Sequence, residues 1–257
     1  DTLLPSAAVP DHAGRHVPGA RRVFLPSKDS NGAGSARETR FRNAAHAGPQ
    51  HQDAARERLA REILGAEALA IYDGPILETQ RPVGVSLTNA TALLWRLETL
   101  GCDPGKRWSD LAALWKGHAD GRLCVFADIH AVMTALRAGD GAELERLLAA
   151  MRRTAADGTE SAPIYRDLGL PVAQGLSSYC RGAYGEAVEH LLPARADLWR
   201  MGGSYAQRDV IDWTLAEAAV RAGQRDVAVS LAHERLGLRP ASAPNQRFLK
   251  AAEAIAA

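Results

Sequence analysis

Apolar residues recur at helical spacing along most of the chain from about residue 52 onward. In the segment 53–73, Leu59, Ile63, Ala66 and Ala70 fall on one face of a helix. The same period continues in segments that we expect to be helices over residues 87–100, 109–118, 123–138, 142–156, 168–181, 184–201, 205–222, 225–236 and 245–256. No stretch shows the alternation of a convincing strand. The pattern therefore predicts an all-α fold.

Glycines interrupt this helical pattern at nearly regular intervals. Gly139, Gly182 and Gly223 each end one expected helix and precede another, at spacings of 43 and 41 residues. Gly175 lies upstream of the second turn, where a small residue lets two helices approach closely. This arrangement matches the tetratricopeptide pattern, although the spacing exceeds the standard repeat of about 34 residues. We expect an α-solenoid of irregular tetratricopeptide-like helical hairpins; a generic antiparallel bundle is the alternative.

The first 50 residues differ from the rest in composition and in the pattern of apolar positions. They contain five of the 13 prolines, several glycines and no sustained apolar period. Such a segment buries too little to offset its ordering entropy, so we expect disorder or loose packing over 1–50 and a helical-repeat domain over 51–257. A weak basic arm for RNA or acidic lipid is one alternative. Another is that the segment is truncated or non-native, because a GC-rich gene read out of frame yields the same residue bias.

Charge and composition narrow the class of protein. Lys and Arg total 31 against 30 Asp and Glu, a net charge of +1, which argues against a nucleic-acid partner. No apolar run approaches the roughly 18 residues of a membrane-spanning helix. The three cysteines, Cys102, Cys124 and Cys180, form no close pair, so neither a disulfide framework nor a zinc site is indicated. We expect a cytoplasmic protein with no metal and no cofactor.

Several short segments carry a closer resemblance. They are AIYD at 70–73, LWRL at 94–97, RW at 107–108, FADIH at 126–130, DLGLP at 167–171 and GGSYAQRDV at 202–210. In this order and spacing, residues 64–257 resemble the tetratricopeptide repeat protein 38 family. The resemblance implies an α-solenoid and no established reaction. Residues 1–60 lack the His- and Trp-rich hairpins with which that family begins, which favours the truncated or misread interpretation of this segment.

The longest of these segments holds the first candidate site. Ser204 and Gln207 have the spacing of a capping box at the start of the helix 205–222. Arg208 could bind an anion at this helix N-terminus, with Gln207 and Asp209 beside it. The structural alternative is a capped helix whose Arg208 is held by Asp209, by Asp212 or by a carboxylate on a neighbouring hairpin.

Four more residues could take part in binding. Asp128 and His130 are two apart on a helix, so they point about 200° from each other and cannot share one metal. A histidine beside an apolar face is also typical of a hydrogen-bonded core residue. His118 could approach either of them. Trp108, expected in a loop, could line a groove, or it could simply pack between hairpins.

Two functions remain open on this basis. One is a binding scaffold whose concave groove holds a protein or peptide partner. The other is a small-molecule-binding protein or enzyme with a polar pocket around Asp128, His130 and Arg208. Convergence of these side chains in one pocket would favour the second, and separate hairpin interfaces would favour the first.

Overall fold

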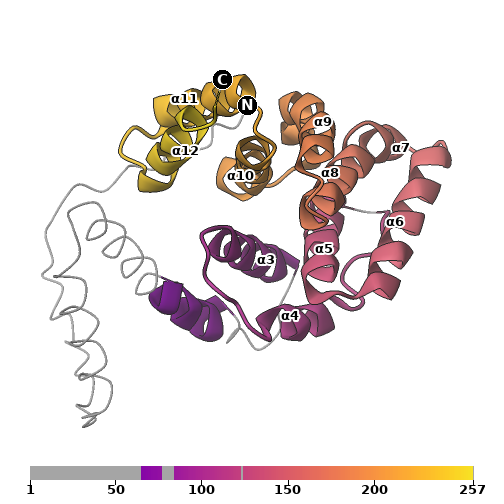
Figure 1. The fold of residues 1–257 in the computed structure, drawn as a ribbon. Helices are drawn as coiled ribbons and strands as arrows, with labels where there is room; N and C mark the ends of the chain where they lie inside the picture. The colour runs from indigo at the N-terminus through magenta and orange to yellow at the C-terminus, as the bar shows by residue number, and fades with distance from the viewer. Residues whose placement is uncertain (1–64, 77–83, 123, 257) are drawn as a thin grey trace, which may run out of the picture. The chain divides into compact units, whose positions relative to one another are not determined.

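The computed structural model describes residues 65–76, 84–122 and 124–256 (Figure 1). The chain divides into two units, Asp1–Asp53 and Ala54–Ala257, and every described residue belongs to the second. The segment 1–50, for which we expect disorder or loose packing, lies outside the described residues.

All regular elements in this part of the chain are helices, which confirms the all-α prediction there. A helical run over 65–71 leads into a π-helical turn, η1. The elements are η1 (Tyr72–Ile76), α3 (Gly84–Thr99), α4 (Arg107–Trp115), α5 (Val125–Ala138), α6 (Gly141–Ala156), α7 (Ala162–Ile164), the π-helical turn η2 (Tyr165–Gly169), α8 (Leu170–Cys180), α9 (Tyr184–Ala194), the 3₁₀ helix η3 (Arg195–Met201), α10 (Tyr205–Arg221), α11 (Arg225–Leu238) and α12 (Ala243–Glu253). Among the described residues, no helix is long and apolar enough to cross a membrane.

The observed bounds differ from the predicted ones at a few ends. α3 begins at Gly84, three residues before the predicted start of that helix. The helix predicted over 184–201 is α9 followed by η3. Pro193 lies near the end of α9, and because proline lacks an amide N–H it removes one helical hydrogen bond close to the point where the geometry changes.

The turn glycines behave as predicted. Gly139, Gly182 and Gly223 have φ angles of +70°, +79° and +69°, the left-handed region that residues with a side chain avoid. Gly139 also caps α5, since its N–H donates to the carbonyl of Ala135. Each glycine lets the chain reverse within two or three residues, so that successive helices form hairpins.

The hairpins pack closely. The pairs α5/α6, α8/α9, α10/α11 and α11/α12 are all in contact, as Figure 1 shows. At Gly175 of α8, an added Cβ would lie only 2.6 Å from Cγ of Leu191 on α9. The expected role of a small residue at this crossing is therefore confirmed.

The helix α3 departs from a simple stack of neighbouring hairpins, because it contacts both α5 and α10. Trp95 of α3 is fully buried and its Nε1 donates to Oγ1 of Thr214 on α10 at 2.9 Å. On the α5 side, the hydroxyls of Thr91 and Thr134 lie 3.0 Å apart. The face that α5 and α10 turn toward α3 is thus covered by the chain itself.

Candidate functional site

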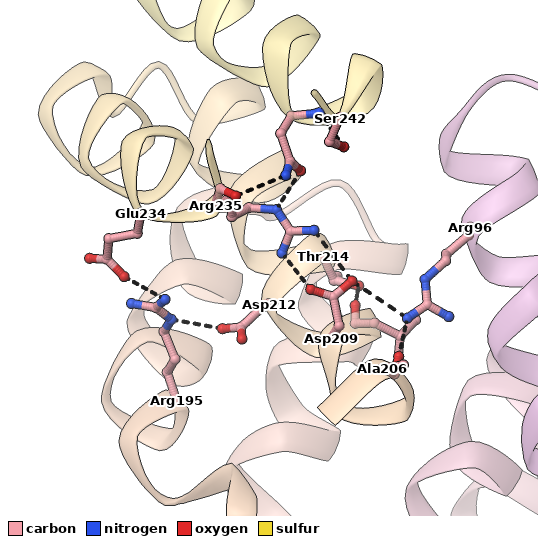
Figure 2. Close-up of polar contacts among 11 residues, drawn as sticks. Arg96, Arg195, Ala206, Asp209, Asp212, Thr214, Glu234, Arg235 and Ser242 are labelled. Carbon is pink, nitrogen blue, oxygen red and sulfur yellow. Dashed lines mark hydrogen bonds and ion pairs between the residues drawn. The ribbon is translucent and has the colours of Figure 1, made fainter. Parts of the chain in front are cut away.

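The most deeply buried ion pair recorded in the described chain joins Asp209 of α10 to Arg235 of α11 (Figure 2). Nη1 of Arg235 donates to Oδ1 of Asp209 at 2.9 Å, and Nη2 donates to Oδ2 at 3.3 Å. The side chains of Arg235 and Asp209 are only 8% and 7% exposed. This two-pronged geometry is the one that a planar guanidinium matches and an ammonium cannot.

The third donor of Arg235 fastens the last helix. Its Nε donates to Oδ1 of Asn245 at 3.1 Å, and Nδ2 of Asn245 returns a hydrogen bond to the Arg235 carbonyl at 3.1 Å. Asn245 is held in the first turn of α12 because Ser242 caps that helix through the Asn245 amide. The guanidinium also lies 5.4 Å from the centre of the Trp213 ring. Arg235 therefore links α10, α11 and α12.

A second arginine approaches Asp209 from α3. Nη2 of Arg96 lies 3.7 Å from Oδ2 of Asp209 and donates to the carbonyl of Ala206 at 2.7 Å. Figure 2 shows the Asp209 carboxylate between the two guanidiniums. Burial lowers the pKa of Arg96, and Asp209 partly offsets this. The residue predicted as a binding group thus joins α3 to the carboxy-terminal hairpins.

Asp212 has a partner of its own. Nε of Arg195 donates to Oδ1 of Asp212 at 2.7 Å, while Nη2 of the same arginine lies 2.6 Å from Oε2 of Glu234 (Figure 2). Burial raises the pKa of Asp212, and the Arg195 guanidinium opposes this shift. Arg195 accordingly joins η3 to α10 and α11.

The predicted capping box is present. The Ser204 amide donates to Oε1 of Gln207 at 2.8 Å, and the Gln207 amide donates to Oγ of Ser204 at 3.2 Å. The side-chain amide of Gln207 also donates to Oδ1 of Asn89 on α3 at 3.1 Å. Gln207 therefore holds the helix start and its contact with α3.

The predicted ion pair of Arg208 is wrong. Its guanidinium donates to the carbonyls of Gly202, at 3.1 Å, and Gly203. Asp209 and Asp212 are taken by Arg235 and Arg195, and no carboxylate in the described chain contacts Arg208. The side chain folds back because the two-glycine turn leaves these carbonyls outside any helix.

Asp128 is 1% exposed, and its carboxylate accepts hydrogen bonds from the Tyr165 hydroxyl of η2 at 2.5 Å, from the Gly121 amide at 3.0 Å and from the backbone of Asp120. Burial raises the pKa of Asp128, while these donors oppose the shift. The carboxylate thus fastens η2 and the loop before α5 to α5 itself.

His130 is also 1% exposed, but only one of its ring nitrogens is satisfied. Nδ1 lies 2.7 Å from the carbonyl of Phe126, and a carbonyl only accepts, so Nδ1 carries the proton. Nε2 is then a bare acceptor, and no group in the described part of the chain donates to it. Burial lowers the pKa of His130 to about 4, and the nearby Arg96 adds to the shift.

The two remaining candidates lie apart from these groups. Trp108 is not in a loop: it belongs to α4, is 5% exposed, and donates to Oε2 of Glu98 at 3.0 Å. The helical pattern missed this because α4 starts at Arg107, two residues before the predicted start. His118 is exposed beyond the end of α4, and no hydrogen bond or ion pair in the described chain joins it to Asp128 or His130.

The predicted site residues therefore sit in different interfaces. Within the described residues, no hydrogen bond or ion pair joins any two of Asp128, His130, Arg208 and Asp209. The described part of the chain also has no group of three His, Cys, Asp or Glu side chains that could hold a metal ion.

A groove that the sequence pattern did not reveal runs between the hairpins α5/α6 and α8/α9. Its volume is about 370 Å³. Its lining, here called the leucine groove, consists of Leu136, Leu144, Leu148, Arg152, Leu170, Gln174, Ser177, Ser178, Arg181, Glu186 and His190. The four leucines are only partly buried. The spacing of Leu144, Leu148 and Arg152 on α6 was the available signal, because Leu147 and Met151 already supply the core face of that helix.

Charged side chains border the leucine groove on two walls. Arg152 of α6 pairs with Glu145 at 2.9 Å, and Arg181 after α8 pairs with Glu186 at 3.3 Å. All four side chains are more than half exposed, so water screens both pairs. Arg181 also donates to Oγ of the buried Ser178 at 3.2 Å, and the Ser178 hydroxyl donates to Oε2 of Glu186 at 3.2 Å. The groove thus combines an apolar floor with charged side chains that are mostly exposed. No protein-family model matches this chain, and no solved structure matches it.

Proposed function

We propose that the chain is a helical-repeat scaffold that binds a peptide segment of a protein partner. Its hairpins would form an irregular tetratricopeptide-like α-solenoid, as the resemblance to the tetratricopeptide repeat protein 38 family implies. The binding surface is the leucine groove rather than the face shared by α5 and α10, because α3 covers that face. A cytoplasmic location belongs to the same proposal, because three cysteines without a close pair in the sequence do not suggest a disulfide framework.

The observation that carries the proposal is the apolar floor of the leucine groove. Leu136, Leu144, Leu148 and Leu170 pack against the core but keep part of their surface in water. Covering a leucine-sized side chain completely is worth about 1.5–3 kcal/mol, so each apolar side chain that a partner inserts would contribute free energy of this order to binding. Apolar grooves with a polar rim are the usual docking sites for peptide segments.

The arrangement of the charged residues also supports a scaffold. Asp128, Asp209 and Asp212 each hold together elements that are distant in sequence. Groups committed to such pairs stabilise a fold and are not free to handle a substrate.

The proposal is tested by panning a display library of random short peptides on the full chain. We expect enrichment of peptides with spaced apolar residues, and loss of their binding in a Leu144→Ser/Leu148→Ser variant. Leu114→Ser is the matched control, because Leu114 is 36% exposed on α4 and does not line the groove. Failure to enrich any peptide, or equal binding by the groove variant, would contradict the proposal.

A second candidate function, binding of a small molecule or an enzymatic reaction around Asp128, His130 and Arg208, is favoured by one observation. Nε2 of His130 is a buried acceptor with no partner among the described residues, which is uncommon in folded proteins. A thermal-shift screen of metabolites on the full chain tests this. A stabilising compound whose effect disappears in His130→Gln would favour the second function over the first.

A further inference from the structure

We infer that the partner segment of the leucine groove is acidic: it carries carboxylates on both sides of its apolar side chains. This inference rests on the proposed peptide-binding function and adds the chemistry of the partner. It follows from which charges border the groove and from how weakly they are held.

The lining contains two guanidiniums, those of Arg152 and Arg181, but one carboxylate, that of Glu186. Arg152 stands on the α6 wall, one turn beyond Leu148, and Arg181 stands at the end of the α8 wall. A segment lying on the leucine floor therefore passes a guanidinium on each wall. Guanidinium is the cation that recognises carboxylates best, because its planar fork can donate two hydrogen bonds to them at once.

The present partners of these arginines can be exchanged. Glu145 and Glu186 are 66% and 59% exposed, and the arginines that they meet are 56% and 61% exposed. Ion pairs with this much water around them contribute little to stability, so replacing the internal carboxylate by one from a partner costs the fold little. Arg235, by contrast, is 8% exposed and bound on three sides, so it is not available in this way.

The groove also offers polar groups beside its apolar floor. Gln174 is exposed on α8, and His190 is half-buried on α9. Neither carries a fixed charge that would repel an acidic segment. A basic segment, however, would place its positive charges next to Arg152 and Arg181. Glu186 is the one carboxylate in the lining that could attract such a segment.

The experiment starts from the peptides enriched on the full chain. We expect Asp and Glu to be over-represented beside the apolar positions. In fluorescence anisotropy, Arg152→Glu/Arg181→Glu should weaken these acidic peptides at least about tenfold. Twin peptides with Lys in place of Asp and Glu should bind that variant better than they bind the unaltered chain. Arg153→Glu/Arg225→Glu is the control with the same change in net charge, since neither residue lines the leucine groove.

The outcomes distinguish failure of the acidic partner from failure of the peptide-binding function. Enriched peptides without excess Asp or Glu, or acidic peptides that ignore the double reversal, would overturn the acidic partner. If their binding is still lost in Leu144→Ser/Leu148→Ser, the peptide-binding function survives. If no peptide is enriched, or if the leucine variant binds normally, the proposed function fails and the acidic partner fails with it.

Discussion

Tyr165 and Asp128, which are 37 residues apart, share a 2.5 Å hydrogen bond that fastens the π-helical turn η2 to α5. The same carboxylate accepts from the Gly121 amide, and the Gly121 carbonyl in turn accepts from the hydroxyl of Thr154 on α6. One buried acid therefore organises the region where the hairpin α5/α6 meets the next part of the chain.

Replacing Tyr165 by Phe should destabilise the protein. The change removes the only side-chain donor that is recorded for the buried Asp128 carboxylate in the described chain, and a hydrogen bond to a charged group contributes about 1.5–3 kcal/mol. Urea denaturation of the unaltered chain and of Tyr165→Phe measures the loss. Tyr205→Phe serves as the control, because Tyr205 is 49% exposed. Equal losses in the two variants would show that the hydroxyl contact with Asp128 does not matter.

Arg235→Met should lower the free energy of unfolding by about 3–5 kcal/mol, because it leaves the buried Asp209 without its main partner. The free energy of unfolding of Arg235→Lys should lie between those of the unaltered chain and of Arg235→Met, since an ammonium cannot reach Asp209 and Asn245 together. The double variant Arg235→Met/Asp209→Leu should recover much of the loss. Arg225→Met is a control at an exposed pair. A double variant as unstable as the sum of both single changes would argue against the pair.

Protonation of His130 should make the protein less stable in mild acid. The pKa of His130 is about 4 in the folded chain, against about 6.5 in an unfolded one. Between these values the unfolded chain binds a proton that the folded chain excludes. The contribution of His130 to stability should therefore fall as the pH drops from about 6.5 to about 4, by up to about 3 kcal/mol, and this contribution should change no further at lower pH.

Comparison with His130→Gln isolates this effect, because the other histidines titrate in both proteins. The stability of the unaltered chain relative to His130→Gln should shrink as the pH falls through this range in a series of urea titrations. Parallel curves for the two proteins would mean that His130 accepts a proton in the folded state.

Gly175→Ala should cost about 1–3 kcal/mol through overpacking, because the new methyl would lie 2.6 Å from Leu191 Cγ. Gly185→Ala in α9 should have the opposite effect on stability. Nothing lies within 4 Å of its added Cβ, so the helix should become more stable by up to about 1 kcal/mol. Thermal melts of both variants give the comparison, and a change of the same sign in both would contradict the close crossing of α8 and α9.

Local features of the sequence predicted most of the fold. The helical period predicted where the helices lie. Gly139, Gly182 and Gly223 were predicted as turns because only glycine adopts positive φ angles easily, and the structure confirms this. The predicted capping box of Ser204 and Gln207 is also present. All of these depend on residues a few positions apart, whose interactions are the same in any fold.

The partners of the charged residues could not be predicted in this way. Asp209 meets Arg235, 26 residues later, and Arg96, more than a hundred residues earlier, rather than its neighbour Arg208. These pairs depend on how helices pack, and the period of a single helix carries no such information. The leucine groove was missed for a related reason: the spacing on α6 sets Leu144 and Leu148 beside the core face, but only the position of α8 and α9 decides that a groove lies there.

The hydrogen bond between Trp95 and Thr214 spans 119 residues, and it bears on how the molecule is made. In an array whose units touch only their neighbours, each unit can fold as soon as the next one emerges from the ribosome. Here α3 is synthesised early, but the indole of Trp95 finds its partner only after α10 has been translated. Closing so long a loop slows folding, and until it closes a large aromatic surface stays open to chaperones and to other chains.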